Sequence, residues 1–393
     1  MNAVVFERSV PRFAAARLAG SLVPGGGVRV GPLKLADVDE PELRGPAWRR
    51  VRPRLAGICG SDLATVDGRA SRYFEPIVSF PFVPGHEVVG ELDDGSRVVL
   101  EPVLGCAARG VEPVCDSCAL GLTGGCERVA FGHLKPGLQT GYCADTGGGW
   151  SVALAAHESQ LHPVPERMSD EDAVMVEPAA CAVHAAYAEA LPGDLVVVLG
   201  AGTLGLCVVA ALRRFRDPST LVAVAKHPEQ RRLAADLGAD VVVEPGEERR
   251  AVRRLTGALQ AGAQLTAGAN VVVDCVGNAD SLADSLAVVA PRGHVVLVGM
   301  PGVVRVDLTP LWHREVKLSG AYAYGKELEN LTAFELAFQL VAEAGLGRLV
   351  SATYELDRYR EAVEHAAGAG GRGAVKVAFD LRHERERDRL VVT

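Results

Sequence analysis

The chain has 393 residues, of which 48% are hydrophobic, and a formal net charge of −8 with both signs interspersed. A chain of this length and composition buries a large core and folds as two or at most three domains. The acidic balance leaves no basic footprint for nucleic acid, so we expect no nucleic-acid partner. Charges at Glu7 and Arg8 interrupt the first apolar stretch too early for a secretory signal, which makes the cytoplasm the expected compartment.

The first 165 residues or so are rich in Gly, Pro and short β-branched runs, such as residues 97–100, with turn residues between them. This pattern predicts a β-rich and loop-rich region. From about residue 190 the pattern changes to apolar strands that alternate with Ala- and Leu-rich helical stretches. Such alternation predicts an α/β domain with a doubly wound parallel sheet. The expected strands are residues 195–199, 221–225, 241–243, 271–275 and 295–298.

The last part of the chain predicts a helix over residues 331–344, a strand over 374–379 and a charged tail from Arg382. One earlier segment, residues 195–212, has no charge and reaches the length at which a membrane span becomes a candidate. Its first half is β-branched and its centre is rich in Gly, so a buried strand that turns into a buried helix explains it better. We therefore expect no membrane partner.

A candidate catalytic metal site is formed by Cys59, in Gly57-Ile58-Cys59-Gly60-Ser61-Asp62, and by His86, in Gly85-His86-Glu87. A thiolate, an imidazole and a carboxylate suit a catalytic zinc, which keeps one position open and acts as a Lewis acid. Either Glu87 or the distant Glu177 completes or supports the set, and Asp62 is placed to orient His86. Each motif alone is more often structural, so the prediction depends on their joint occurrence.

A second candidate metal site consists of Cys106, Cys115, Cys118 and Cys126. Four thiolates suit a closed, tetrahedral structural zinc. The gap between Cys106 and Cys115 exceeds the usual two to four residues, so Cys106 as a bystander stays an alternative. The chain has nine cysteines, an odd number, and far more residues than a fold that needs disulfides, which favours metal binding in a reducing compartment. The remaining Cys143, Cys181, Cys207 and Cys275 are expected to be small buried residues.

A Gly-rich turn, Gly200-x-Gly202-x-x-Gly205, with Thr203 and Leu204 at its variable positions, follows the predicted strand at 195–199. Gly200 allows a tight turn, Gly202 lets the backbone approach a pyrophosphate, and Gly205 lets helix and strand pack closely. The helix N-terminus then faces the phosphates. The turn therefore predicts a dinucleotide site.

The end of the next strand reads Ala225-Lys226-His227, where an NAD enzyme would have an acid for the ribose 2′-hydroxyl. Ala225 and its basic neighbours are what a 2′-phosphate requires, which favours NADP over NAD. If Lys226 is only a solvated charge at the strand end, the preference is mixed.

Two metal sites and a dinucleotide site indicate a dehydrogenase, and the chain resembles the medium-chain, zinc-dependent alcohol and polyol dehydrogenases over nearly all its length. Cys59-Gly60-Ser61-Asp62, Gly85-His86-Glu87, the cysteines and the Gly-rich turn occur in family order. Glu177-Pro178 stands where the polyol, threonine and glucose dehydrogenase branch has a Glu near the catalytic zinc. Residues 141–142 and 147–151 also resemble glucose dehydrogenases.

The resemblance implies a GroES-like catalytic domain of residues 1–187, completed by about 336–393, and a Rossmann domain of residues 188–335. It implies two zinc ions per chain, NADP or NAD, a small-molecule alcohol substrate and a homodimer or homotetramer. Ser61 would receive the proton of a secondary alcohol that delivers a hydride to the nicotinamide, with Asp62 and Glu87 as further catalytic residues. One departure concerns Ala64, which stands where the family has a relay His.

Two alternatives remain at this point. A zinc-free quinone-type reductase has the same fold, but it has no need for Cys59, His86 and the four-cysteine set together. A dinucleotide-binding protein without catalysis also remains, because fold alone does not determine function.

Overall fold

The chain divides into two compact units, which the computed structural model describes over residues 1–189, 193–262, 264–328 and 331–383. The first unit combines Met1–Glu177 with Tyr324–Thr393, and the second is Pro178–Ala323. Both ends of the chain therefore build one unit. The domain boundaries implied by the family, after residues 187 and 335, stay a prediction. The two compact units are defined by contacts within the chain and do not test those boundaries. Most of the predicted charged tail lies outside the described residues.

The first unit is built on a mostly antiparallel sheet with the order β18-β19-β3-β4-β5-β7, in which β6 also pairs with β3. A separate antiparallel pair, β1 (Asn2–Phe6) and β2 (Leu33–Asp37), packs its apolar side chains into the same core. The strands of the main sheet are β3 (Trp48–Gly57), β4 (Val88–Glu91), β5 (Arg97–Leu100), β6 (Leu154–His157), β7 (Leu161–Pro163), β18 (Val350–Tyr354) and β19 (Lys376–Asp380).

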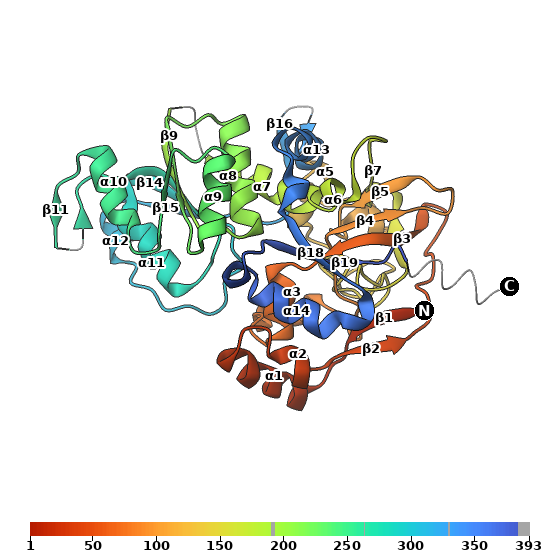
Figure 1. Ribbon diagram of the computed structural model, residues 1–393. Coiled ribbons are helices and arrows are strands. Elements are labelled where there is room, and N and C mark those ends of the chain that lie inside the picture. Colours follow the sequence, from red (N-terminus) through yellow and green to blue (C-terminus); the bar gives the residue numbers. More distant parts are fainter. Residues whose placement is uncertain (190–192, 263, 329–330, 384–393) are drawn as a thin grey trace. The chain divides into compact units, whose positions relative to one another are not determined.

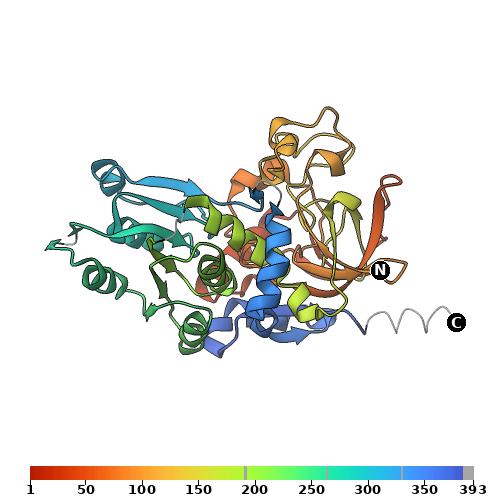
Figure 2. The ribbon, with the colours of Figure 1, turned by 90° about the horizontal axis from the view of Figure 1, so that it is seen from above.

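Helices and short hairpins surround this sheet. They are α1 (Val10–Leu22), α2 (Gly27–Val30), α3 (Gly60–Val66), α4 (Cys106–Arg109), α5 (Asp116–Ala119), α6 (Asp170–Ala173), α13 (Ala333–Ala344), α14 (Tyr359–Ala367) and the strand pair β16 (Lys326–Leu328) and β17 (Leu331–Thr332). Helix α7 (Val176–Glu189) begins in this unit and continues into the second. The segment with α4 and α5 forms a lobe at the edge of the first unit, golden in Figure 2.

The second unit has a six-stranded parallel sheet with the order β10-β9-β8-β13-β14-β15. This order, which runs outward in both directions from the first strand, is that of a doubly wound Rossmann sheet. Its helices lie along the sheet in Figure 1. The elements are β8 (Leu195–Leu199), α8 (Thr203–Phe215), β9 (Thr220–Val224), α9 (Pro228–Asp236), β10 (Val241–Val243), α10 (Glu248–Thr256), β11 (Gln260–Ala261), β12 (Gln264–Leu265), β13 (Ala269–Asp274), α11 (Ala279–Val288), β14 (Val289–Leu297), α12 (Thr309–His313) and β15 (Lys317–Gly320).

The five strands expected in this unit are all present, and the fold class is confirmed. The expected strands 195–199 and 241–243 match at both ends, and the ends of the other three strands differ by one to six residues. The uncharged residues 195–212 form β8, the Gly-rich turn and most of α8. Both β8 and the centre of α8 are buried, because helices and neighbouring strands cover them on all sides. No helix in the described ranges is both long and apolar enough to cross a membrane.

Helix α1 was not expected in the region predicted to be β-rich. Among its 13 residues only Ala16 is buried. The helix therefore shows no apolar periodicity from which the sequence could predict it. Pro11 occupies its first turn, where a missing N–H costs nothing. The segment that joins α1 to α2 is anchored by Asp67, which accepts hydrogen bonds from the backbone of Gly25 and Gly27 at 3.0 and 3.1 Å.

Candidate active site and metal centres

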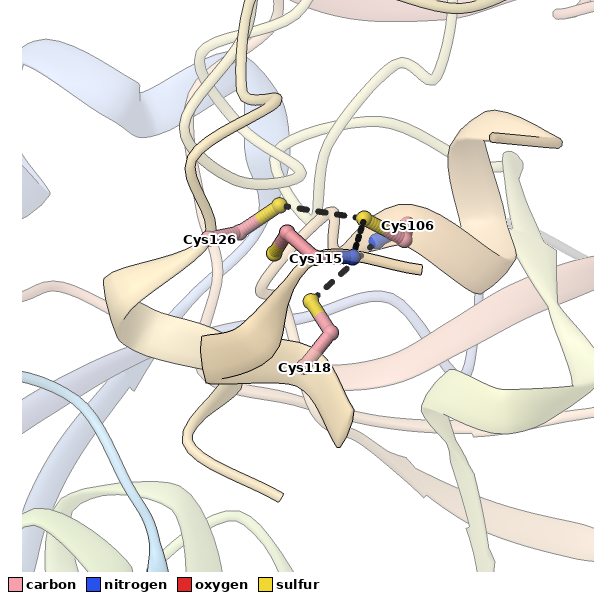
Figure 3. A group of neighbouring side chains, drawn as sticks. All are labelled: Cys106, Cys115, Cys118 and Cys126. Atoms are coloured by element: carbon pink, nitrogen blue, oxygen red, sulfur yellow. Dashed lines mark hydrogen bonds between the residues drawn. The ribbon is translucent and has the colours of Figure 1, made fainter. Parts of the chain in front are cut away.

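The four cysteines of the second predicted metal site lie together in the lobe of α4 and α5 (Figure 3). Their sulfur atoms all lie within 4.8 Å of one another, and those of Cys106 and Cys126 are 3.7 Å apart. A Zn–S bond of about 2.3 Å places the sulfurs of a tetrahedron about 3.8 Å apart. The observed spacing fits that geometry, and Cys106 is part of the cluster rather than a bystander.

Backbone N–H groups point at these sulfurs. Cys115 N donates to Cys106 Sγ at 3.4 Å, and Cys106 N to Cys118 Sγ at 3.5 Å. Burial opposes a thiolate at Cys115, but the backbone of Cys118 and Glu127 outweighs it and lowers the pKa of Cys115 to about 7. Burial raises the pKa of Cys118 and of Cys126. A cation at the centre would be needed to hold four thiolates so close together.

A single buried cation, Arg109, ties this lobe together. Its side chain is fully buried and donates to the carbonyl oxygens of Leu104, at 3.0 Å, and Phe131, at 3.1 Å. It also donates to the carbonyl of Gly137. The helix that carries Cys106 is therefore fixed to the segment that follows Cys126. The sequence analysis did not single out Arg109, because its partners are backbone atoms that no motif marks.

In the first predicted site, Cys59 caps helix α3 at its N-terminus. Its backbone N–H donates to Asp62 Oδ2 at 3.0 Å, and its side chain accepts from the third residue of the helix. This reciprocal pair is a capping box. Thr65 Oγ1, one turn on, donates to the carbonyl of Ser61 at 2.9 Å. Cys59, Ser61 and Asp62 are therefore held in one rigid turn.

His86 is brought to this turn by the loop before β4. Gly85, with a φ of 94°, adopts a left-handed conformation that other residues rarely take, and a Cβ there would lie 2.3 Å from Trp150 Cδ1. The indole of Trp150 is fully buried and its Nε1 donates to the carbonyl of Gly57 at 3.4 Å. The Gly85-His86 pair thus needs its glycine, because the indole occupies the space of a side chain.

His86 is buried beside Ser61 and Asp62. Ser61 Oγ lies 3.5 Å from His86 Nε2, and Asp62 Oδ1 lies 3.5 Å from His86 Nδ1. The second contact is electrostatic, because Nδ1 makes no hydrogen bond among the described residues. Burial opposes a charge on the ring, but Asp62 and Cys59 outweigh it and raise the pKa of His86 well above its usual value.

The two candidate acids of this site are engaged with other residues. The Glu87 carboxylate forms a buried ion pair with Lys376, whose Nζ is 2.7 Å from Oε1. Glu177 accepts a hydrogen bond from the hydroxyl of Tyr324. Burial and the charge of Glu87 raise the pKa of Glu177 to about 7, against the opposing charge of His86. Glu177 therefore lies close enough to Glu87 and His86 to interact electrostatically with both.

The structure does not gather the first set as tightly as the four cysteines. Within the described residues, the four-cysteine group is the one in which three or more ligand atoms lie within 4.8 Å of each other. Cys59 and His86 lie near each other, while Glu87 is paired with Lys376 and Glu177 with Tyr324. Nevertheless the set fits a catalytic zinc, because a ligating His typically has a carboxylate beside its second ring nitrogen, as Asp62 is here.

The Gly-rich turn has the geometry that the motif requires. Gly200 has a φ of 91°, and a Cβ on Gly205 would lie 1.9 Å from the carbonyl oxygen of Gly200. A Cβ on Gly202 would meet nothing within 4 Å, so the backbone is open there. Thr203 and Leu204 follow as the first residues of α8. A pyrophosphate can therefore approach the backbone at the start of this helix.

The end of β9 has no acid. Ala225 is fully buried, and Lys226 is exposed beside His227. The guanidinium of Arg231 lies at the same strand end, where it donates to the carbonyl of Lys226 at 2.9 Å and pairs with Glu244 at 3.1 Å. The sequence analysis missed Arg231, which lies in the first turn and a half of α9, although a basic residue soon after this strand is the signal that identifies it.

Comparison with known proteins agrees with this geometry. Residues 45–166 match the alcohol dehydrogenase GroES-like domain, and residues 203–343 match the zinc-binding dehydrogenase domain. A sorbitol dehydrogenase of Arabidopsis thaliana is 30% identical over 359 residues, covering 86% of this chain and 89% of that protein. An L-idonate 5-dehydrogenase of Vitis vinifera is 28% identical over 363 residues, covering 89% and 92%.

Among solved structures, an oxidoreductase/dehydrogenase of unknown specificity, involved in membrane biogenesis, from Escherichia coli superposes with a TM-score of 0.73. It is 22% identical, with 96% of this chain and 99% of that chain covered, and shows the same fold. The matched domains, the four-cysteine lobe and the dinucleotide turn together identify zinc and a nicotinamide as the cofactors. The chain thus belongs to the zinc-dependent medium-chain alcohol and polyol dehydrogenases and is an oxidoreductase that acts on an alcohol.

Proposed function

We propose that this enzyme interconverts the secondary hydroxyl of a polyol or sugar and the corresponding ketone, with Cys59, His86 and Glu177 as the catalytic zinc ligands and NADP as the preferred nicotinamide. The observation that carries the proposal is the rigid turn in which Cys59 and Ser61 flank His86, with Asp62 behind the ring. Relatives named as sorbitol and L-idonate dehydrogenases support a polyhydroxylated substrate.

The residues around His86 have different roles in the proposed reaction. When bound, zinc supplies a Lewis acid at the substrate hydroxyl, and the nicotinamide accepts the hydride. Ser61 Oγ, 3.5 Å from His86 Nε2, is placed to accept the proton of the substrate hydroxyl while it passes its own proton to water. The Asp62 carboxylate lies 3.5 Å from His86 Nδ1 and so holds the ring's orientation.

Glu177 is favoured over Glu87 as the third ligand. The carboxylate of Glu87 is compensated by the buried ammonium of Lys376, so a second cation would compete for a charge already neutralised. Glu177 accepts a hydrogen bond from the neutral hydroxyl of Tyr324, and it stands where the polyol dehydrogenase branch has a Glu near the catalytic zinc. Glu87 then acts with Lys376 as a charge pair beside the site.

The preference for NADP rests on the end of β9. Lys226 and Arg231 supply positive charge, and His227 a further ring nitrogen, where Ala225 leaves no carboxylate to accept from a ribose hydroxyl. A 2′-phosphate is bound well by such groups.

We further propose that the enzyme works in the cytoplasm, where the thiols of the metal sites stay reduced. We also propose that it forms a homodimer or homotetramer.

The test is hydride transfer on a panel of polyols, sugars and simple alcohols with both nicotinamides, before and after chelation and zinc reloading. We expect polyol oxidation that is lost on complete metal removal and restored by zinc. Ser61→Ala should lower turnover by about 10² to 10⁴, the contribution of one acid–base group. Full activity without metal would favour a zinc-free reductase, and cofactor binding without turnover on any substrate would favour a non-catalytic protein.

A further inference from the structure

The hydroxyl of Tyr142 lies against the first turns of helix α3, although Tyr142 belongs to a distant loop. It donates to Asp62 Oδ1 at 3.3 Å and lies 3.3 Å from Thr65 Oγ1. Because Thr65 already donates to the carbonyl of Ser61, the phenolic proton is free for Asp62. One hydroxyl therefore connects two side chains that lie one turn apart on the helix that begins at Cys59.

The tyrosine is fixed by packing. Its ring lies 5.2 Å from that of Phe82 and 6.0 Å from that of His86, and only 9% of the residue is exposed. Its hydroxyl is thereby held against α3, where it donates to Asp62.

Asp62 is held at both oxygens. Oδ2 accepts from the backbone of Cys59 at 3.0 Å, and Oδ1 accepts from Tyr142 and faces His86 Nδ1. The residue is 1% exposed, and a buried carboxylate that lost one of these donors would be left partly unsatisfied. The first contact comes from its own helix, so the second decides where the carboxylate points relative to the imidazole.

We propose that Tyr142 is a positioning residue of the catalytic metal site, whose hydroxyl holds Asp62 beside His86 and so fixes the imidazole in its ligating orientation. The inference rests on the proposed function, since it takes His86 as a zinc ligand. Position 64 carries no ring that could do this from within α3, because it is the small, buried Ala64. The support comes instead from a segment 80 residues away in the sequence.

The experiment measures metal affinity rather than turnover alone. Purified full-length enzyme is first freed of its labile metal. Wild type and Tyr142→Phe are then titrated with zinc and, separately, with cobalt, whose binding is measured by its absorption spectrum. This substitution removes only the hydroxyl. We expect the affinity of the catalytic site to fall about 10- to 100-fold, as for other partners of a ligating His. The zinc of the four-cysteine site and the affinity for the nicotinamide should not change.

Two controls keep the result specific. Tyr354→Phe removes a tyrosine hydroxyl from the same unit, where it bonds His365 Nδ1 at 2.9 Å, and should leave metal affinity unchanged. Asp62→Asn should weaken metal binding on its own, and adding Tyr142→Phe to it should cost little more, because both act through one carboxylate. If the Tyr142 variant folds poorly, Asp62→Asn alone tests whether this carboxylate supports metal binding, and an unchanged metal affinity would contradict the proposal.

Wild-type metal affinity in a folded Tyr142→Phe, or full additivity with Asp62→Asn, would overturn the role of Tyr142. Failure of the wild type itself to bind a second metal ion would instead contradict the proposed catalytic site. The two failures are therefore distinguishable.

Discussion

The two candidate metal sites of the first unit are assembled in different ways. All four sulfurs of the cysteine lobe come from residues 106–126 and lie within 4.8 Å of one another. The catalytic set draws on α3, the loop before β4 and the start of α7, and its acids are engaged with Lys376 and Tyr324. A local site is arranged by its own short segment, whereas a distributed site depends on supporting residues from the rest of the fold.

The largest expected effect is on the distributed site. His86→Ala should lower oxidation of every alcohol by about 10² to 10³-fold or more, the scale of losing a principal electrostatic stabiliser. Binding of the nicotinamide should be nearly unchanged, because the Gly-rich turn belongs to the second unit. Steady-state kinetics and cofactor titration check this, and full activity in the variant would refute a role for His86 in the chemistry.

Loss of a ligand from the four-cysteine site should lower the stability of the protein rather than its catalytic rate. Cys115→Ser removes one ligand of the four, and we expect the free energy of unfolding to drop by about 4 kcal/mol or more, as when a structural metal is lost. Denaturant unfolding measures the change, with Cys143→Ser as the control for a buried cysteine outside the cluster. Equal losses in the two variants would show that packing, and not metal, stabilises the lobe.

A third experiment extends the comparison to the second unit. Ala225→Asp places a carboxylate at the end of β9, where it would accept from the ribose hydroxyls of NAD and repel a 2′-phosphate. We expect the ratio of kcat/KM for NADP and NAD to shift toward NAD by tenfold or more, about 1.4 kcal/mol. A wild type that already favours NAD tenfold would contradict the proposed cofactor preference.

The smallest expected effect is a pH dependence in the second unit. Burial lowers the pKa of His294, although Glu189 opposes it, and Ser319 Oγ lies 2.6 Å from its Nε2. A depressed pKa means that the folded state prefers the neutral ring. This contribution to stability is present above the ordinary pKa of about 6.5 and is lost as the pH falls through the lower folded value.

Thermal unfolding across this range should therefore show a loss of stability toward acid that is smaller in His294→Gln, whose amide can still bond Ser319. Identical pH profiles for the two proteins would rule out a contribution from His294.

The sequence predicted what depends on local pattern. The strands of the second unit were found because uninterrupted apolar runs mark buried parallel strands, and the Gly-rich turn because its backbone geometry admits only glycine at Gly200 and Gly205. The four cysteines were found by spacing. Helix α1 was missed, because it buries too little apolar surface to show a period.

The supporting contacts could not be predicted in this way. Tyr142 and Asp62 are 80 residues apart, Tyr324 and Glu177 are 147 apart, and Lys376 and Glu87 are 289 apart. Spacing arguments describe one helix, strand or turn at a time. The tertiary fold of the first unit brings these pairs together, and no local pattern marks them. The sequence therefore offered the candidate ligands of the distributed site and Asp62 beside His86, but not Lys376, Tyr324 or Tyr142.

The most direct test of two separate zinc sites is to count the metal in three proteins. Wild type, Cys115→Ser and His86→Ala are purified with zinc, and the bound metal per chain is measured together with polyol oxidation. We expect two ions in wild type and one in each variant, with the remaining ion of His86→Ala supporting stability while polyol oxidation falls by about 10²-fold or more. A single ion in fully loaded wild type that Cys115→Ser leaves in place, or wild-type turnover in His86→Ala, would contradict the assignment.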